Sequence, residues 1–169
     1  LTVTAENSAD SASIADFKRQ KRYRLMWMGT KYEPGTVKVV AYNEKGDAVA
    51  EKEIHTAGKP DHIELVADRN EIKADGKDLS FVTVRVVDKE GNLCPDAQHL
   101  IKYAVKGAGT YRAGANGDPT SLELFHVPQM KVFNGMMTAV VQSTDKPGEI
   151  TLTATGKGLK SGRLVLISK

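Results

Sequence analysis

Three polar turns gather oxygen-bearing side chains that a calcium ion could use. They hold these pairs: Asp75 with Asp78, Asp88 with Glu90, and Asn116 with Asp118. Ca²⁺ takes about six to eight oxygen ligands, which loops of a β-domain can supply. No segment has the ligand spacing of an EF-hand, however, and Asp and Asn are also the ordinary residues of turns. The pattern therefore predicts turns, and no bound metal ion is expected.

The nitrogen and sulfur ligands form no such cluster. Four histidines are scattered over four segments, and Cys94 is the one cysteine, so no zinc-binding spacing exists and no intramolecular disulfide can form. A nucleophilic cysteine would need an organised base, and nothing in the pattern fixes His99 beside Cys94. We interpret Cys94 as a small packing residue, and no cofactor is expected.

The most specific pattern of the chain runs from residue 109 to 143. A glycine-rich turn at 114–118 leads into Pro-Thr-Ser-Leu-Glu and then Phe-His, and Phe-Asn-Gly at 133–135 opens an apolar strand. The polar positions of this motif loop are Asn116, Gly117, Asp118, Thr120, Ser121, Glu123 and His126. Glu123 is expected to accept backbone N–H or hydroxyl bonds and so fix the loop, and His126 is expected to hold it with a hydrogen bond. A structural loop is therefore predicted, with no catalytic residue in it.

Sugar recognition would require exposed aromatic rings. The chain has one Trp, five Tyr and four Phe. Tyr111 in the glycine-rich stretch is the first candidate sugar contact. Trp27 is the second, although its alternation with Leu25 favours a place in a core.

The elements that must position these residues are strands. Apolar residues alternate with period 2 in short runs separated by Gly, Pro, Asn and Asp, which is typical of a β-sandwich. Only residues 13–18 could make a turn of helix. The strands are expected at 23–28, 36–42 and 48–55, with a doubtful one at 1–4, and then at 62–67, around 72, 80–88, 100–105, 135–143, 148–155 and 162–167.

The break between two domains is predicted at Thr-Ala-Gly-Lys-Pro, residues 56–60, because Gly and Pro together mark a linker. Residues 1–57 are expected to form a partial β-sandwich that lacks its N-terminal side, residues 58–60 a linker, and residues 61–169 a complete immunoglobulin-like β-sandwich. The predicted fold class is all-β.

Composition excludes several functions. With 40% hydrophobic and 27% charged residues, the chain is an ordinary globular one, and no apolar run could span a bilayer. The net charge of +3 is mild. The basic run at 18–22 could touch nucleic acid, but no nucleic-acid-binding motif accompanies it, so a solvated loop or strand edge is favoured. The N-terminus has no signal-peptide pattern.

The motif at 109–143 resembles the immunoglobulin-like C-terminal domain of glycoside hydrolase family 2 enzymes of the β-galactosidase type. Those domains carry a similar G-x-G-N-G-D-x-T-S-x-E-x-F-H run followed by F-x-G; here Ala115 precedes Asn116, so the first glycines are offset. Residues 23–27 and 32–42 resemble the second half of the sandwich that precedes this domain in the family. The resemblance covers residues 23–169.

The resemblance implies a non-catalytic accessory region of a larger glycosidase, serving domain packing, cleft shaping or oligomerisation. The family's two catalytic carboxylates stand on a barrel of alternating strands and helices, and no such alternation exists here. The implied partners are other domains of the parent glycosidase and a carbohydrate, and the implied location is the periplasm or the exterior. The alternative is an independent carbohydrate-binding or adhesion-type immunoglobulin-like module.

Overall fold

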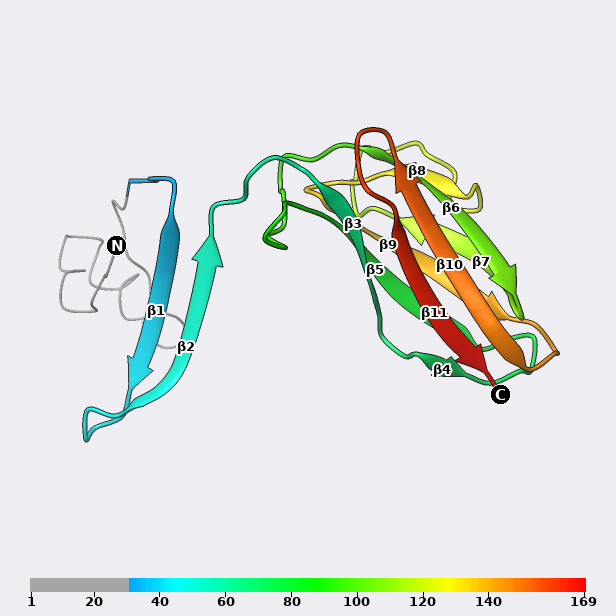
Figure 1. Cartoon of the computed structure of the whole chain (residues 1–169), viewed down its shortest axis with the longest axis horizontal. Helices are drawn as coiled ribbons and strands as arrows, with labels where there is room; N and C mark the ends of the chain where they lie inside the picture. Colours follow the sequence, from blue (N-terminus) through cyan, green and yellow to red (C-terminus); the bar gives the residue numbers. More distant parts are fainter. Residues whose placement is uncertain (1–30) are drawn as a thin grey trace. The chain divides into compact units, whose positions relative to one another are not determined.

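The computed structural model describes residues 31–169, which divide into two compact units between Thr56 and Ala57. All regular structure in these residues is β-strand, so the all-β prediction is confirmed (Figure 1). No helix in this range is long and apolar enough to cross a membrane. The helical turn expected at 13–18 and the strands expected at 1–4 and 23–28 lie outside the described residues.

The described part of the first unit is an antiparallel hairpin of β1 (Thr36–Tyr42) and β2 (Ala48–His55). Its turn is stabilised by Asn43, whose side-chain oxygen accepts the N–H groups of Lys45 and Asp47 at 2.9 Å. Gly46 supplies the positive φ of 85° that closes the turn. Both strands occupy the predicted ranges, because polar turn residues flank them on each side.

The second unit is a sandwich of two sheets. Its strands are β3 (His62–Ala67), β4 (Glu71–Ile72), β5 (Leu79–Val87), β6 (Leu100–Gly107), β7 (Gly109–Ala115), β8 (Gln129–Lys131), β9 (Met136–Ser143), β10 (Gly148–Gly156) and β11 (Gly162–Ser168). One sheet has the order β3-β5-β9-β7, and the other has the order β4-β11-β10-β6-β8.

This order is that of an immunoglobulin-like domain. Strands β3, β5, β9 and β7 take the A, B, E and D positions of one sheet, and β11, β10 and β6 take the G, F and C positions of the other. The short β4 pairs in parallel with the last strand, β11, and thereby carries the first part of the domain from one sheet to the other.

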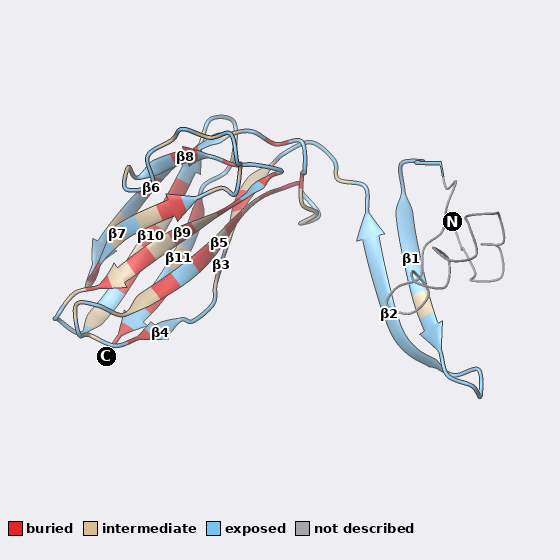
Figure 2. Cartoon of the chain, turned by 180° about the vertical axis from the view of Figure 1, so that it is seen from behind, coloured by how far each residue is buried: buried red, intermediate tan, exposed pale blue. Residues whose placement is uncertain are grey.

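The core lies between the two sheets and follows the alternation of the strands. Val82, Val84 and Val86 of β5 are fully buried, whereas Thr83 and Arg85 face outward, as the sequence predicts. The facing sheet contributes Ile101 and other inward residues at every second position of β6, β10 and β11. Figure 2 shows the resulting stripes of buried and exposed residues along the strands.

Two features of the motif region differ from the prediction. The glycine-rich stretch expected to be a turn from residue 114 begins as β7, which ends at Ala115. The strand expected from 135 begins at Met136, after a two-residue hairpin turn. In that turn Asn134 and Gly135 have φ values of 50° and 74°, and Phe133 and Met136 exchange backbone hydrogen bonds at 3.0 Å. Two positive φ values are what a type I′ turn requires, and Asn-Gly supplies them with little strain.

Candidate functional site

Residues 116–128, here called the edge segment, connect β7 to β8 and cross from one sheet to the other along the open side of the sandwich. The N–H of Gly114 donates to the carbonyl of Phe125 at 2.8 Å, and the N–H of Tyr103 on β6 donates to the carbonyl of Pro128 at 2.9 Å. The edge segment is therefore bonded to a strand of each sheet. Its backbone satisfies polar groups that an open sheet edge would leave exposed.

The first turn of the edge segment is built by Asn116 and Asp118. The Asn116 oxygen accepts the N–H of Asp118 at 3.1 Å. One oxygen of Asp118 accepts both the N–H of Thr120 at 2.8 Å and its hydroxyl at 2.7 Å, and these bonds lower the pKa of the Asp118 carboxyl. Such bonds are how Asn and Asp usually fix turns. Gly117 has a φ of 75° in this turn.

Glu123 and Asn116 hold the backbone of Lys131 from both sides. The Lys131 N–H lies 3.2 Å from both carboxylate oxygens of Glu123, and its carbonyl accepts the side-chain N–H of Asn116 at 3.0 Å. The Ser121 hydroxyl accepts the Glu123 N–H at 3.3 Å. The polar residues of the motif therefore tie the edge segment to strand β8.

His126 does not take part in this network. Its ring is exposed, and it forms no hydrogen bond within residues 31–169. The predicted bond to the loop is therefore wrong for the described part of the chain. The loop is closed instead by the backbone carbonyls of its neighbours, Phe125 and Pro128.

Tyr111 is also not the exposed ring that the sequence suggests. It alternates with the buried Gly109 along β7 and lies opposite the buried Val141, so its half-buried ring faces the core and stacks on Tyr103 with ring centroids 5.6 Å apart. Burial raises the pKa of the Tyr111 phenol, and its hydroxyl donates to the Phe125 carbonyl at 3.3 Å. The structure gives Tyr111 a packing role, and its contact with a sugar stays a prediction. Trp27, the other candidate, lies outside the described residues.

The edge segment presents apolar side chains to its surroundings. Leu122 is 95% exposed, Leu124 61% and Phe125 62%. These residues stand on a backbone fixed by the bonds described above, so they are held in place rather than carried on a free loop. A fixed cluster of exposed large apolar residues is typical of a surface that contacts another protein part.

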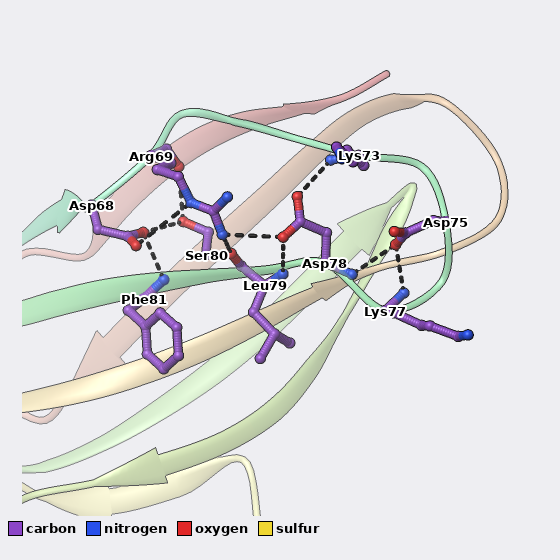
Figure 3. Close-up of polar contacts among 9 residues, drawn as sticks. All are labelled: Asp68, Arg69, Lys73, Asp75, Lys77, Asp78, Leu79, Ser80 and Phe81. Atoms are coloured by element: carbon purple, nitrogen blue, oxygen red, sulfur yellow. Dashed lines mark hydrogen bonds and ion pairs between the residues drawn. The ribbon is translucent and has the colours of Figure 1, made fainter.

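The carboxylates of the turn at 75–78 accept hydrogen bonds from the backbone of the same chain. Asp75 accepts the N–H groups of Lys77 and Asp78, and Asp78 accepts those of Lys73 and Leu79 (Figure 3). These backbone bonds lower the pKa of both carboxyls. The aspartates are thus already occupied as hydrogen-bond acceptors.

Arg69 completes the network in Figure 3. Its guanidinium donates to Asp78 at 3.1 Å and also bonds the carbonyl of Leu79. Asp68 accepts the N–H of Phe81 at 2.8 Å. The network therefore joins the loops on either side of β4 to the start of β5, and in residues 31–169 no group of three acidic, His or Cys side chains is arranged to hold a metal ion.

Asp88 has a structural role that the sequence pattern did not predict. It is buried, and its carboxylate accepts the N–H of Gly58 at 2.7 Å and those of Glu90 and Asn92 at 3.0 and 2.8 Å. The bond from Gly58, followed by those from Asn92, lowers its pKa to about 2. Asp88 therefore joins the start of the second unit to the hairpin after β5. The Asp-x-x-Gly-Asn pattern indicated a turn, but no local pattern pointed to Gly58.

Cys94 lies in the core beside this hairpin. It is 4% exposed, and burial raises the pKa of its thiol. Neither property suits a nucleophile, which needs access and a lowered pKa. The packing role predicted for Cys94 agrees with this position.

A depression of about 530 Å³ lies at the opposite end of the sandwich from the domain start. It is lined by the turns at 107–108 and 144–149, including the exposed Asp145 and Glu149. The Glu149 carboxylate accepts the hydroxyl of Thr151 at 3.1 Å, so it acts within its own strand. Thr144 and Lys146 also line this depression.

The two sheets and their strand order define an immunoglobulin-like β-sandwich domain. The profile of the glycoside hydrolase family 2 C-terminal domain 5 matches residues 63–165, and that of a domain of unknown function matches residues 6–50. Since the first match covers more than half of the chain, the chain belongs to the glycoside hydrolase family 2 group that carries this domain.

Individual relatives agree with this assignment. A β-galactosidase of Bacteroides ovatus, BoGH2A, is 52% identical over 134 residues, which are 79% of this chain and 16% of that protein. A β-galactosidase of Thermoanaerobacter pseudethanolicus is 38% identical over 109 residues, 64% of this chain and 13% of that protein. A crystal structure of a glycosyl hydrolase family 2 member from Bacteroides cellulosilyticus superposes with a TM-score of 0.77 at 35% identity, over 83% of this chain and 18% of that one. The chain therefore spans less than a fifth of the relatives it matches.

Proposed function

We propose that this chain is the non-catalytic C-terminal region of a family 2 glycoside hydrolase of β-galactosidase type, and that its edge segment packs against another part of that enzyme. The similarity to two β-galactosidases supports the type of parent enzyme. The exposed, bonded cluster of Leu122, Leu124 and Phe125 supports the packing role. The proposed location is the periplasm or the exterior, where polymeric glycosides are encountered.

The observation that carries this proposal is the contrast between the two kinds of side chain in the edge segment. Its polar residues apart from His126 form hydrogen bonds within the domain, whereas its largest apolar residues point outward. Burying one Leu side chain contributes about 1.5–3 kcal/mol, so an interface with several of them would add measurably to the stability of a parent enzyme.

The test uses the full glycosidase that contains this chain. Leu122→Ser combined with Leu124→Ser is compared with Val165→Ser combined with Ile167→Ser, which changes two similarly apolar, exposed residues of β11. The first variant should lower the melting temperature and speed inactivation, and the second should change both far less. Equal effects of the two variants, or none, would contradict a docking role for the edge segment.

The non-catalytic assignment has its own assay. The purified chain should hydrolyse neither a nitrophenyl β-galactoside nor a nitrophenyl β-glucuronide. Hydrolysis that co-purifies with the chain through two different columns would contradict it.

A further inference from the structure

The outward face of the sheet β4-β11-β10-β6-β8 differs from the rest of the domain in charge. On β6 the outward residues are Leu100, Lys102, Ala104 and Lys106, and on β11 they are Arg163, Val165 and Ile167. Lys131 of β8 lies directly opposite Leu100. We call Lys102, Lys106, Lys131 and Arg163 the cationic face.

Register places these cations around the threonines of the strand between them. Thr151 of β10 lies opposite Lys106, Thr153 lies between Ala104 and Arg163, and Thr155 lies opposite Lys102. Lys102 and Lys106 are about 13 Å apart along β6. Arg163 on β11 lies two strand spacings, about 10 Å, from Ala104, which is midway between these two lysines. Figure 1 shows β11, β10 and β6 side by side, so the cations and hydroxyls share one surface.

Two carboxylates lie near these cations without pairing with them: Glu123 bonds the backbone N–H of Lys131, and Glu149 bonds a hydroxyl. Lys102, Lys106, Lys131 and Arg163 are exposed, and none forms an ion pair in the described range. Glu149 is the carboxylate among the outward residues of β10, and it accepts the Thr151 hydroxyl. On the opposite sheet, by contrast, Arg85 of β5 pairs with Glu64 of β3 at 2.6 Å.

The residue types on this face favour one class of binding partner over others. Protein interfaces deplete Lys and bury aromatic anchors, and the outward residues of this sheet include no Phe, Tyr or Trp. Single-stranded nucleic acid would need aromatic rings for stacking, and a neutral sugar would need an aromatic platform. Separated cations with hydroxyls between them suit a hydrated polymer that carries charges at intervals, because its charged groups and its hydroxyls can both be bonded.

We propose that the cationic face binds an anionic polysaccharide, carrying carboxylate or sulfate groups, across strands β6, β10 and β11. The cations neutralise charges of the polymer and Thr151, Thr153 and Thr155 bond its hydroxyls. This role is independent of the packing proposed for the edge segment, because the two sites use different residues.

The test is affinity electrophoresis of the 169-residue chain at about 20 mM salt, where screening is weak. Gels contain polygalacturonate, a sulfated galactan or a neutral galactan, and titration calorimetry gives the dissociation constants. The chain should be retarded by at least one of the two anionic polymers, and the comparison between them shows whether carboxylate or sulfate is preferred. The neutral galactan should not retard it.

The key variant changes Lys102, Lys106 and Arg163 to Gln, and it should bind about tenfold or more weakly. The matched control changes Lys73, Lys77 and Lys89 to Gln, which removes the same charge from exposed turns outside strands β6, β8, β10 and β11, and it should bind almost as well as the parent. If the triple variant fails to fold by circular dichroism, the single variants Lys102→Gln and Lys106→Gln replace it, each with a smaller loss.

Three results would overturn the proposal. They are no retardation by either anionic polymer, equal weakening in the key and control variants, and tighter binding to single-stranded DNA than to both polysaccharides. If the edge-segment variants failed to destabilise the glycosidase, the measured polysaccharide binding would be unaffected. The two proposals are therefore tested separately.

Discussion

The carboxylate of Glu123 accepts the backbone N–H of Lys131 with both oxygens 3.2 Å from the nitrogen, so an acidic side chain of the edge segment takes the place of a neighbouring strand beside β8. The carbonyl of the same residue is bonded by Asn116 at 3.0 Å. The short strand β8 is thus paired with β6 on one side and with side chains on the other. This explains how three residues can remain a strand at the edge of the sheet.

Replacing Glu123 by Gln should loosen β8 locally. The substitution removes the charge that strengthens the bond, which should cost about 1 kcal/mol of unfolding free energy and should speed hydrogen exchange of the Lys131 amide. Exchange measured by NMR or mass spectrometry checks this. Glu149→Gln, which changes a carboxylate on β10 that accepts a side-chain hydroxyl, is the control and should leave the Lys131 amide unchanged. Equal protection of that amide in both variants would refute the role of Glu123.

Gly135→Ala should destabilise the domain more than Gly117→Ala, although both glycines have φ near 75°. A Cβ on Gly135 would lie 2.2 Å from the carbonyl oxygen of Cys94, whereas a Cβ on Gly117 meets nothing within 4 Å. Backbone strain alone costs about 1 kcal/mol, and the clash with backbone adds to it. Urea unfolding should therefore give a difference of about 2 kcal/mol or more between the variants. Similar midpoints would mean that the turn at 133–136 can shift.

The strands could be predicted from sequence because their signals are local. Alternating residues such as Val82, Val84 and Val86 identify a half-buried strand, and Asn43-Glu-Lys-Gly-Asp identifies a hairpin turn without reference to the rest of the chain. Strand β8 was missed because it has three residues and owes its existence to Glu123 and Asn116, which are 8 and 15 positions away. Tyr111 was taken as exposed because its glycine-rich surroundings indicated a loop, whereas residues 109–115 form β7.

The ionised carboxylate of Asp88 should make the free energy of unfolding depend on pH. Its folded pKa of about 2 lies below the ordinary value of 3.8, so its contribution is fully present above pH 4 and is lost as the pH falls toward 2. In Asp88→Asn only one side-chain atom is a hydrogen-bond acceptor, so the N–H groups of Gly58 and Asn92 cannot both keep their bonds to this side chain. The variant should lower the urea midpoint clearly at pH 7 but much less at pH 2. Asp96→Asn, an exposed neighbour, is the control. A gap that stays constant from pH 7 to pH 2 would show that the charge of Asp88 is not what stabilises this junction.

Cys94 should react slowly with thiol reagents in the folded chain. It is 4% exposed, its pKa is raised by burial, and its Sγ lies 3.7 Å from the carbonyl oxygen of Gly58. Labelling by a coloured disulfide reagent at pH 8 should take much longer than in urea. Asp88→Asn should speed it, because release of Gly58 uncovers the thiol. Rapid labelling of the folded parent chain would contradict the packing role.

Tyr111→Ala should cost far more stability than Tyr111→Phe, because the ring rather than the hydroxyl carries the interaction. The ring stacks on Tyr103 at 5.6 Å inside the sandwich, whereas the hydroxyl makes one bond of 3.3 Å to the Phe125 carbonyl. Loss of the ring should cost about 2–3 kcal/mol, and loss of the hydroxyl about 0.5–1 kcal/mol. Thermal and urea unfolding measure both. If instead Tyr111→Phe abolished polysaccharide binding while stability stayed unchanged, the hydroxyl of the half-buried Tyr111 would be a sugar contact.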